Sequence, residues 1–276
     1  MSYIVHIVRM MWAFILLFPA TASPVFAQNA APDKCLALAQ MPQRQLIQKA
    51  GFRPAALKTF ELSLRYLGHS TFLLKSPKGV TIATDYNDYI TVQPAPTIAT
   101  MNLAHDSHHS YNPDPAIKHL LRGWNSIPGN AQIHDISEQD VRVRNVPTNL
   151  RSYGNGVLKY GNSIFVFEVS GLCVAHLGHL HHTLTVQQLA QIGQMDVVLI
   201  PVDGSWTLDV TGMMSVLKSL RASLVIPMHY FSEETLGRFI TAAQTVFPIK
   251  RLQSSELIIA RDRLPAKTQI WILPPG

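Results

Sequence analysis

Residues 161–185, GNSIFVFEVSGLCVAHLGHLHHTLT, contain two apolar runs and end in a cluster of histidines. The runs cover residues 163–169 and 172–176, and the Ser170-Gly171 pair between them is typical of a turn, so we predict two neighbouring β-strands. The cluster that follows consists of His176, His179, His181 and His182. Imidazoles at the end of a buried strand serve as metal ligands, as solvated loop residues or as core packing, and the rest of the chain must decide between these roles.

The remaining pattern predicts strands in the first half of the chain and alternating strands and helices in the second. Residues 61–85 hold three alternating apolar runs, and further strands are expected at residues 98–104 and 141–146. Helices are expected at residues 115–122, 185–193, 208–220 and 232–247, and buried strands at residues 195–201 and 223–230. This order predicts an α+β fold, a four-layer αββα sandwich in which two mixed β-sheets lie face to face with helices outside.

Composition is that of a folded domain with a large core. Hydrophobic residues make up 47% of the chain and charged residues 14%, so most of the chain must be buried. The net charge of +6 is spread thinly, which argues against nucleic acid as a partner. The partner that we expect is a small-molecule substrate. The length suits one large domain, which we place at residues 59–276 behind a lead-in at residues 28–58.

The first 27 residues have the pattern of a signal peptide. Arg9 precedes an apolar core at residues 10–18, and Val25 and Ala27 supply small residues before the expected cleavage point. We therefore expect a periplasmic or secreted protein with no stable membrane insertion after cleavage, because no later segment approaches the roughly 20 apolar residues that a transmembrane helix needs. A retained N-terminal anchor is the alternative.

The chain has two cysteines, Cys35 and Cys173. An oxidising compartment would permit a bridge between them. A buried free thiol at Cys173 would instead behave as a small apolar residue. The sequence does not set the distance between the two residues, so both alternatives stay open.

Histidines follow three of the predicted strands. His105, His108 and His109 follow residues 98–104, the cluster quoted above follows residues 172–176, and His229 lies in the strand end at residues 223–230. Strand ends that face one edge of a sheet converge in space, and several neutral imidazoles at one edge are what zinc requires. A single histidine near a strand end is more often a hydrogen-bonded structural residue. Three separate groups together favour a metal site.

Residues 62–230 resemble the metallo-β-lactamase superfamily, in particular the branch that includes ascorbate-phosphate lactonase and N-acyl-phosphatidylethanolamine phospholipase D. The matching segments occur in the same order along the chain: RYLGHSTFLLK, the GVTIATD strand that ends at Asp85, the loop at His105, residues 161–185, MDVVLIPVDG and VIPMHY. The resemblance implies the four-layer fold and a hydrolytic site built around metal.

The metal-ligand motifs depart from the family pattern. Where the family has H-x-H-x-D-H, this chain has His105-Asp106-Ser107-His108-His109-Ser110, so that serines replace two histidines and His109 replaces the aspartate. Where relatives have H-L-G-D with a metal-bridging aspartate, this chain has His179. Replacing two carboxylates by imidazoles removes two negative charges that would offset two dications, so we predict one metal ion rather than two.

The resemblance implies a role for each of these residues. The expected metal ligands are His105, His109, His179 and His229, and a shift of one residue would make His108 the ligand in place of His109. Zinc is the expected metal, with manganese or iron as less favoured alternatives because few carboxylates remain. The expected proton carriers are His108, Asp106 and His182. Asp85 is expected to fix a ligand imidazole from behind, His176 to lie behind the ligands or in the packing, and His69 to orient substrate or water beside the site.

We therefore expect an exported metal-dependent hydrolase that uses a metal-bound hydroxide on an ester, lactone, amide or phosphodiester, rather than a true β-lactamase. Zinc can lower the pKa of a bound water to about 7, which supplies hydroxide near neutral pH. The alternative is a catalytically inactive protein of the same fold that binds metal or ligand, because a fold does not by itself determine function.

Overall fold

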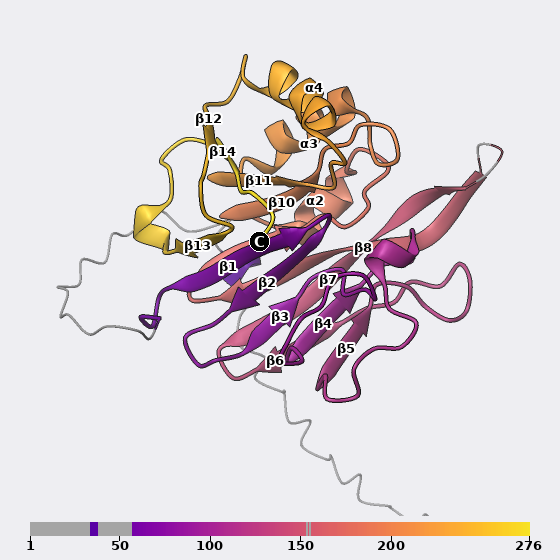
Figure 1. The fold of residues 1–276 in the computed structure, drawn as a ribbon. Coiled ribbons are helices and arrows are strands. Elements are labelled where there is room, and N and C mark those ends of the chain that lie inside the picture. Colours follow the sequence, from indigo (N-terminus) through magenta and orange to yellow (C-terminus); the bar gives the residue numbers. More distant parts are fainter. Residues whose placement is uncertain (1–33, 38–56, 153, 155) are drawn as a thin grey trace, which may run out of the picture. The chain divides into compact units, whose positions relative to one another are not determined.

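Two β-sheets that lie face to face form the framework of the protein (Figure 1). The computed structural model describes residues 34–37, 57–152, 154 and 156–276. The strands of the first sheet are β1 (Leu62–Gly68), β2 (Thr71–Lys75), β3 (Thr81–Ala83), β4 (Ile98–Met101), β5 (His119–Arg122) and β13 (Glu256–Ile259). Those of the second are β6 (Asp135–Glu138), β7 (Val141–Ser152), β8 (Gly156–Val169), β9 (Leu172–His176), β10 (Val197–Pro201), β11 (Leu224–Met228), β12 (Ile249–Arg251) and β14 (Gln269–Ile272).

Both sheets mix parallel and antiparallel pairs. The first sheet has six strands in the order β13-β1-β2-β3-β4-β5, and the second has eight in the order β12-β14-β11-β10-β9-β8-β7-β6. In the first sheet, β1 runs antiparallel to β2 whereas β4 runs parallel to β5. In the second, β8 runs antiparallel to β9 whereas β10 runs parallel to β9 and to β11. The prediction of two mixed sheets is therefore confirmed.

Alternation along the central strands divides their apolar side chains between two cores. In β8, Phe165 and Phe167 belong to the core between the sheets, whereas Ile164 and Val166 belong to the core beneath the helices. Successive side chains of a strand point to opposite faces, so an unbroken apolar run is what a strand buried on both faces requires. The central strands of the second sheet are accordingly covered on both sides.

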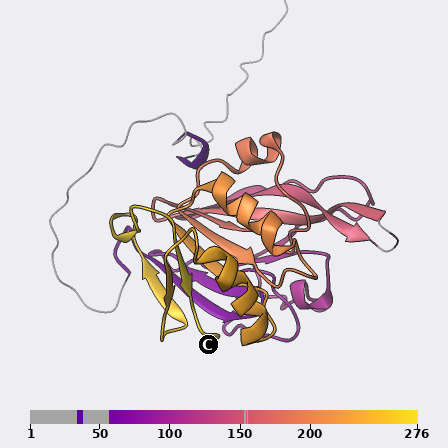
Figure 2. The ribbon, with the colours of Figure 1, turned by 90° about the horizontal axis from the view of Figure 1, so that it is seen from above.

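The helices lie against the outer face of the eight-stranded sheet (Figure 2). They are α1 (Lys34–Ala37), α2 (Val186–Ile192), α3 (Val210–Leu220) and α4 (Glu233–Ala243). The last three begin as the sequence predicts: Thr185 forms a capping box with Gln188, and Asp209 and Ser232 cap α3 and α4. The buried apolar side chains of these helices all belong to the core on that face. The predicted α+β sandwich is confirmed, and its described α-helices lie on one side of it.

The helix that we expected at residues 115–122 is wrong. Residues 119–122 instead form the edge strand β5, which pairs in parallel with β4 from Ile98 and His119 to Met101 and Arg122. The segment is short, and hydrogen bonding to an existing strand outweighs the weak helical preference of so few residues.

The N-terminal predictions fall mainly on residues that the structure does not describe. The expected signal peptide at residues 1–27 lies outside the described residues, and so does the lead-in at residues 28–58 except for residues 34–37, 57 and 58. Among the described helices, none has both the length and the hydrophobicity needed to cross a bilayer.

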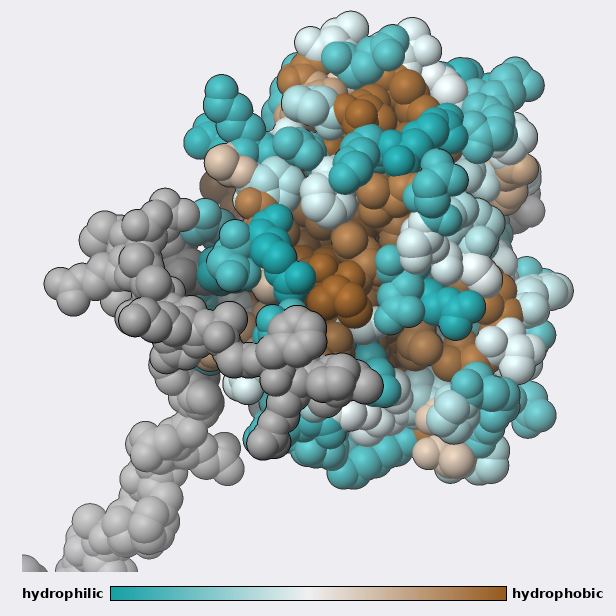
Figure 3. All heavy atoms as spheres, turned by 60° about the vertical axis from the view of Figure 1, so that its left-hand side comes forward, coloured by the Kyte–Doolittle hydropathy of each residue, from teal (hydrophilic) through white to brown (hydrophobic). Residues whose placement is uncertain are grey.

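Some hydrophobic residues reach the surface on the side that lies at the left in Figure 1. There they form a band between hydrophilic margins (Figure 3). Folded proteins generally keep a large apolar share of their surface, so this band alone indicates no binding site.

The two sheets are joined by hydrogen bonds at the edge where the histidines lie. The backbone N–H of His229, directly after β11, donates to the carbonyl oxygen of His69 in the turn between β1 and β2, at 2.6 Å. Beside it, the Nε2 atom of His176 lies 2.8 Å from the carbonyl oxygen of Ser70. The turn of one sheet is thereby fixed against the strand ends of the other.

A disulfide joins Cys35 in α1 to Cys173 in β9, and both residues are buried. This settles the alternatives left open by the sequence in favour of the bridge. It connects residues 138 positions apart, so it removes many conformations from the unfolded chain.

We expect the paired substitution Cys35→Ala and Cys173→Ala to lower the free energy of unfolding by about 2–4 kcal/mol, because the unfolded chain regains its freedom. Denaturant unfolding of the variant and of the wild type, each with and without a reducing agent, measures this. Reductant should reproduce the loss in the wild type and have no effect on the variant. Equal stability of all four samples would contradict the structural role of the bridge.

Candidate metal centre

Six imidazoles meet at the edge where the two sheets are joined. They are His69 from the β1–β2 turn, His105 and His108 from the loop after β4, His179 and His181 from the loop after β9, and His229 from the end of β11. The ring centre of His179 lies 4.7 Å from that of His105 and 4.8 Å from those of His108 and His229. The predicted convergence of strand ends therefore occurs, and it produces a cluster of histidines rather than a mixture of histidines and carboxylates.

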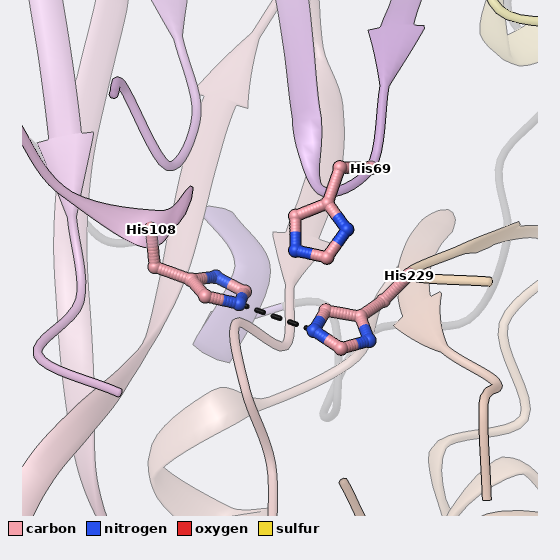
Figure 4. A group of neighbouring side chains, drawn as sticks. All are labelled: His69, His108 and His229. Carbon is pink, nitrogen blue, oxygen red and sulfur yellow. Dashed lines mark hydrogen bonds between the residues drawn. The ribbon is translucent and has the colours of Figure 1, made fainter. Parts of the chain in front are cut away.

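Three of these rings bring their nitrogens together most closely. One nitrogen from each of His69, His108 and His229 lies within 4.8 Å of the other two (Figure 4). The Nε2 atoms of His108 and His229 face each other at 3.2 Å. A neutral imidazole offers one lone pair, so three such nitrogens can bind one cation between them.

A buried carboxylate stands behind His108. The Nδ1 atom of His108 lies 2.5 Å from Oδ2 of Asp85, and both side chains are fully buried. Burial alone would raise the pKa of Asp85, but the facing rings of His176 and His108 and the hydrogen bonds from His108 and Asn102 outweigh it, so that the pKa is lowered. An ionised carboxylate only accepts hydrogen bonds, so His108 carries its proton on Nδ1 and keeps a lone pair on Nε2.

A second carboxylate stands behind His229. Its Nδ1 atom lies 3.1 Å from Oδ1 of Asp203, at ion-pair distance although the angle is poor for a hydrogen bond. Burial would raise the pKa of Asp203, but the contacts with His229 and Thr207 dominate and lower it. Backbone N–H groups of Ser205 and Trp206 also donate to this carboxylate. With Asp203 ionised and facing Nδ1, the Nε2 atom of His229 is the one left to bind a cation.

The backbone is held in an unusual conformation at three of these residues. His69, Asp85 and His229 have φ angles of 48°, 42° and 54°, in the left-handed region that residues other than glycine seldom adopt. Such residues persist only where the surrounding structure fixes them, and they are concentrated at functional sites. Here the hydrogen bond between His229 and His69 supplies part of that support.

Burial keeps most of the clustered imidazoles neutral. It lowers the pKa of His69 to about 3, with the neighbouring rings of His229 and His108 as further causes. It also lowers the pKa of His179 far below its ordinary value, and that of His105 to a smaller extent. Neutral rings are the form in which histidine binds metal.

Comparison with known proteins identifies the fold family. The profile of the Beta-lactamase superfamily domain matches residues 63–229. The chain belongs to this family. The predicted superfamily is thus confirmed, whereas the lactonase and phospholipase branch stays a prediction.

Several relatives of this chain carry the name UPF0173 metal-dependent hydrolase. One from Nanoarchaeum equitans is 23% identical over 61% of this chain and 84% of its own length. One from Carboxydothermus hydrogenoformans is 33% identical over 29% of this chain, and that match spans 36% of the relative. A crystal structure of a protein from Thermotoga maritima, assigned to the metallo-beta-lactamase superfamily, is 26% identical and has a TM-score of 0.57. The match covers 77% of this chain and 98% of that protein. These names agree with the prediction of a metal-dependent enzyme of the superfamily.

The structure brings three of the four expected ligands into the cluster and places the fourth apart from it. His105, His179 and His229 are members of the cluster, but the ring of His109 packs against Tyr111 and Trp124 with its Nδ1 atom 3.1 Å from the carbonyl oxygen of Asn102. A 3₁₀ turn at residues 106–108 directs His108 inward instead. The family motif assumes an extended loop at this point. The 3₁₀ turn shifts the residue that points inward by one position, from His109 to His108.

The residues that we expected around the ligands occupy varied positions. Asp85 lies behind Nδ1 of His108, whereas His69 lies among the clustered nitrogens themselves. His176 is fully buried. Its Nδ1 atom accepts a hydrogen bond from the N–H of Gly178, and its Nε2 atom donates to the carbonyl oxygen of Ser70.

The expected proton carriers are mostly engaged elsewhere. His182 accepts the backbone N–H of Asn149 and donates to the carbonyl oxygen of Thr183, so neither ring nitrogen is left for the cluster. Asp106 is exposed and accepts a hydrogen bond from the hydroxyl of Tyr89. His108 lies in the cluster with Asp85 behind it.

We expect Gly178→Ala to destabilise the site. Gly178 has a φ of 58°, and an added Cβ would overlap the amide oxygen of Asn162 and lie 2.6 Å from Nδ2 of Asn102. These two amides hold His179 and Asp85 in place, because Asn162 accepts the His179 N–H and Asn102 donates to Asp85. The expected loss is about 1–3 kcal/mol in the free energy of unfolding, measured with denaturant.

The matched control is Gly171→Ala. Gly171 has a similar φ of 72° but nothing within 4 Å of an added Cβ. It therefore reports the backbone strain alone, and the Gly178 variant should be less stable than the Gly171 variant. Equal losses in the two variants would contradict a crowded support behind the histidines.

Proposed function

We propose that this protein is a metal-dependent hydrolase that holds one zinc ion between His69, His108 and His229. The observation that carries the proposal is the pair of Nε2 atoms that face each other at 3.2 Å, each on a ring with a carboxylate behind its Nδ1 atom. Two lone pairs at that distance repel unless a cation or a proton lies between them. A metal ion satisfies both nitrogens and the third ring of His69.

The donor set fits zinc. Two nitrogens that each lie about 2.0–2.1 Å from a tetrahedral zinc are roughly 3.3–3.4 Å apart, close to the separation of the two Nε2 atoms. Carboxylates behind ligand histidines fix the tautomer and strengthen the ligand, and both His108 and His229 have one. Imidazole donors suit zinc better than manganese, which prefers carboxylates and water.

One ion is better supported than two. Asp85 and Asp203 supply two negative charges near the cluster, enough to offset one dication. The group of His69, His108 and His229 offers three imidazole nitrogens and contains no carboxylate. Two dications a few ångströms apart would repel each other strongly with so little compensation.

A bound zinc would polarise a substrate oxygen and activate water, which is the chemistry that hydrolysis of an ester, lactone, amide or phosphodiester requires. The protein's own residues orient this chemistry. Asp85 and Asp203 fix the rings of His108 and His229, and the hydroxyl of Ser107 lies 3.1 Å from Nε2 of His69. His105 is exposed and borders the ring of His179, so it is placed to carry protons to solvent.

Export to an oxidising compartment is part of the same proposal. It rests on the signal-peptide pattern of residues 1–27. The disulfide between Cys35 and Cys173 supports it, because disulfides persist mainly in the periplasm or outside the cell.

We expect the purified protein to bind one zinc ion per chain and His108→Ala to lose at least tenfold in zinc affinity, because it removes a ligand. The adjacent His109→Ala is the matched control and should bind zinc like the wild type, since His109 packs outside the cluster. Calorimetric titration of metal-free protein measures both. Loss of zinc in the His109 variant with retention in the His108 variant would overturn the ligand set.

Asp85→Asn should weaken zinc binding by about 10- to 100-fold, because the ring of His108 loses the charged partner that fixes its tautomer. Asp106→Asn is the control, since Asp106 is exposed and pairs with Tyr89. Competition with a chromogenic chelator gives the two affinities. Equal affinity in the two variants would remove Asp85 from the metal site.

Turnover decides between an enzyme and an inactive binder. Ester, lactone, amide and phosphodiester substrates are assayed with the zinc-loaded protein, and again after chelation and after zinc is restored. We expect hydrolysis of at least one class that is lost on chelation and returns with zinc. Zinc binding without turnover of any class would favour an inactive protein of this fold.

A further inference from the structure

His179 has an unsatisfied nitrogen at the centre of the cluster. Its side chain is 1% exposed, and its Nε2 atom has no hydrogen-bond partner among the described residues. The rings of His105, His108 and His229 surround the ring of His179, and their centres lie within 4.8 Å of the His179 ring centre. A buried polar atom without a partner is costly, and one that faces a functional site indicates a missing ligand.

The protonation of His179 follows from a chain of hydrogen bonds. The backbone N–H of Arg151 in β7 donates to Nδ1 of His181. Because a backbone N–H can only donate, this Nδ1 has no proton, and the neutral ring of His181 must carry its proton on Nε2. That Nε2 lies 2.6 Å from Nδ1 of His179, so it donates there. The Nδ1 atom of His179 is then an acceptor, and its proton lies on Nε2.

The start of this chain is firmly anchored. The guanidinium of Arg151 donates to the carbonyl oxygens of Ser205, Trp206 and Thr207, which fixes the strand end that presents the N–H group. At the other end, Asn162 accepts the backbone N–H of His179 at 2.7 Å. The two histidines are thus held in position from both sides, and the direction of the donors is set by the backbone of β7.

We propose that His179 is not a metal ligand but a fixed donor that binds the substrate oxygen on which negative charge develops. The inference rests on the proposed function, because it assumes a hydrolytic site at the cluster. The oxygen is a carbonyl oxygen of an ester, lactone or amide, or a non-bridging phosphoryl oxygen. A preorganised N–H group in a buried site stabilises that charge without having to reorient during the reaction.

Ligation of a metal by His179 would require this chain to reverse. The Nε2 atom would have to lose its proton, so Nδ1 would donate to His181, and the remaining proton of His181 would lie on Nδ1. Two N–H groups would then face each other between Arg151 and His181, at a contact where the structure has a hydrogen bond. His108 and His229 differ in this respect, because the carboxylates of Asp85 and Asp203 direct their protons to Nδ1.

The direct test is the tautomer of His179 in the wild-type protein. Long-range proton–nitrogen NMR correlations of protein labelled with nitrogen-15 in histidine distinguish Nε2–H from Nδ1–H rings. Signals are assigned from the His179→Gln and His181→Gln variants. We expect His179 to be Nε2–H in the metal-free protein and to stay so after zinc is added. A His179 ring that is Nδ1–H, or whose Nε2 signal shifts to a metal-bound position with zinc, would overturn the proposal.

Two substitutions at His179 separate donor from ligand. His179→Leu removes the N–H group, whereas the side chain of His179→Gln can place an amide N–H in a similar position. We expect both variants to bind zinc within about threefold of the wild type. The leucine variant should lose roughly 10²- to 10³-fold in kcat with a smaller change in KM. The kcat of the glutamine variant should be at least about tenfold higher than that of the leucine variant. His119→Ala, at a hydrogen bond with Glu138 on the edge strand β5, is the control for the general effect of losing a histidine.

The outcomes also distinguish this inference from the function on which it rests. If the leucine variant loses zinc as His108→Ala does, His179 is a ligand and the inference fails while the proposed function stands. If wild-type protein neither binds zinc nor turns over a substrate, the proposed function fails first. Circular dichroism shows whether each variant folds, and the NMR experiment uses the variants only to assign the signals of the wild-type protein.

Discussion

The arrangement of the site depends on two imidazoles that face each other with buried carboxylates behind them. Asp85 and Asp203 lie behind His108 and His229, and the two Nε2 atoms are 3.2 Å apart. Each carboxylate faces the Nδ1 atom of its partner ring and favours a proton there, which leaves both Nε2 lone pairs directed into the same small volume. That concentration of lone pairs is unfavourable by itself, and a cation converts it into a binding site.

The backbone that supports this arrangement joins the two sheets at one edge. The His229 N–H donates to His69, which belongs to the turn of the other sheet, and both residues have positive φ angles. Strand ends supply the positions, whereas the strained turn residues supply the directions of the side chains. The site therefore depends on contact between the sheets, and the core between them is what maintains that contact.

Much of the fold could be predicted from the sequence because its local signals agree with one another. Thr185 and Ser232 mark helix starts, and the apolar runs around Phe165 and Val174 are those of strands buried on both faces. The edge strand at residues 119–122 was missed, since an isolated strand of four residues has no periodic signal that separates it from a helical turn.

The convergence of histidines at one sheet edge could be predicted from the sequence, but the identity and role of each histidine could not. Strand ends pointed to His105, His179 and His229, whereas the choice between His108 and His109 depends on a 3₁₀ turn that a linear count of residues does not reveal. The resemblance places His69 beside the site, but its inward direction depends on a positive φ angle that the sequence does not reveal. Asp203 follows strand β10 as Asp85 follows strand β3. This shared position at a strand end was the only hint in the sequence that Asp203 also faces a clustered histidine. The proton on His179 depends on Arg151, a residue 28 positions away along the chain, so no local pattern encodes it.

Anomalous diffraction at the zinc edge from crystals grown with zinc tests the central claim most directly. A single peak is predicted within bonding distance of Nε2 of His108, Nε2 of His229 and one nitrogen of His69, with Nε2 of His179 beyond bonding distance. A peak bound by His105 and His179 without His108, or no peak at the cluster at all, would contradict the account.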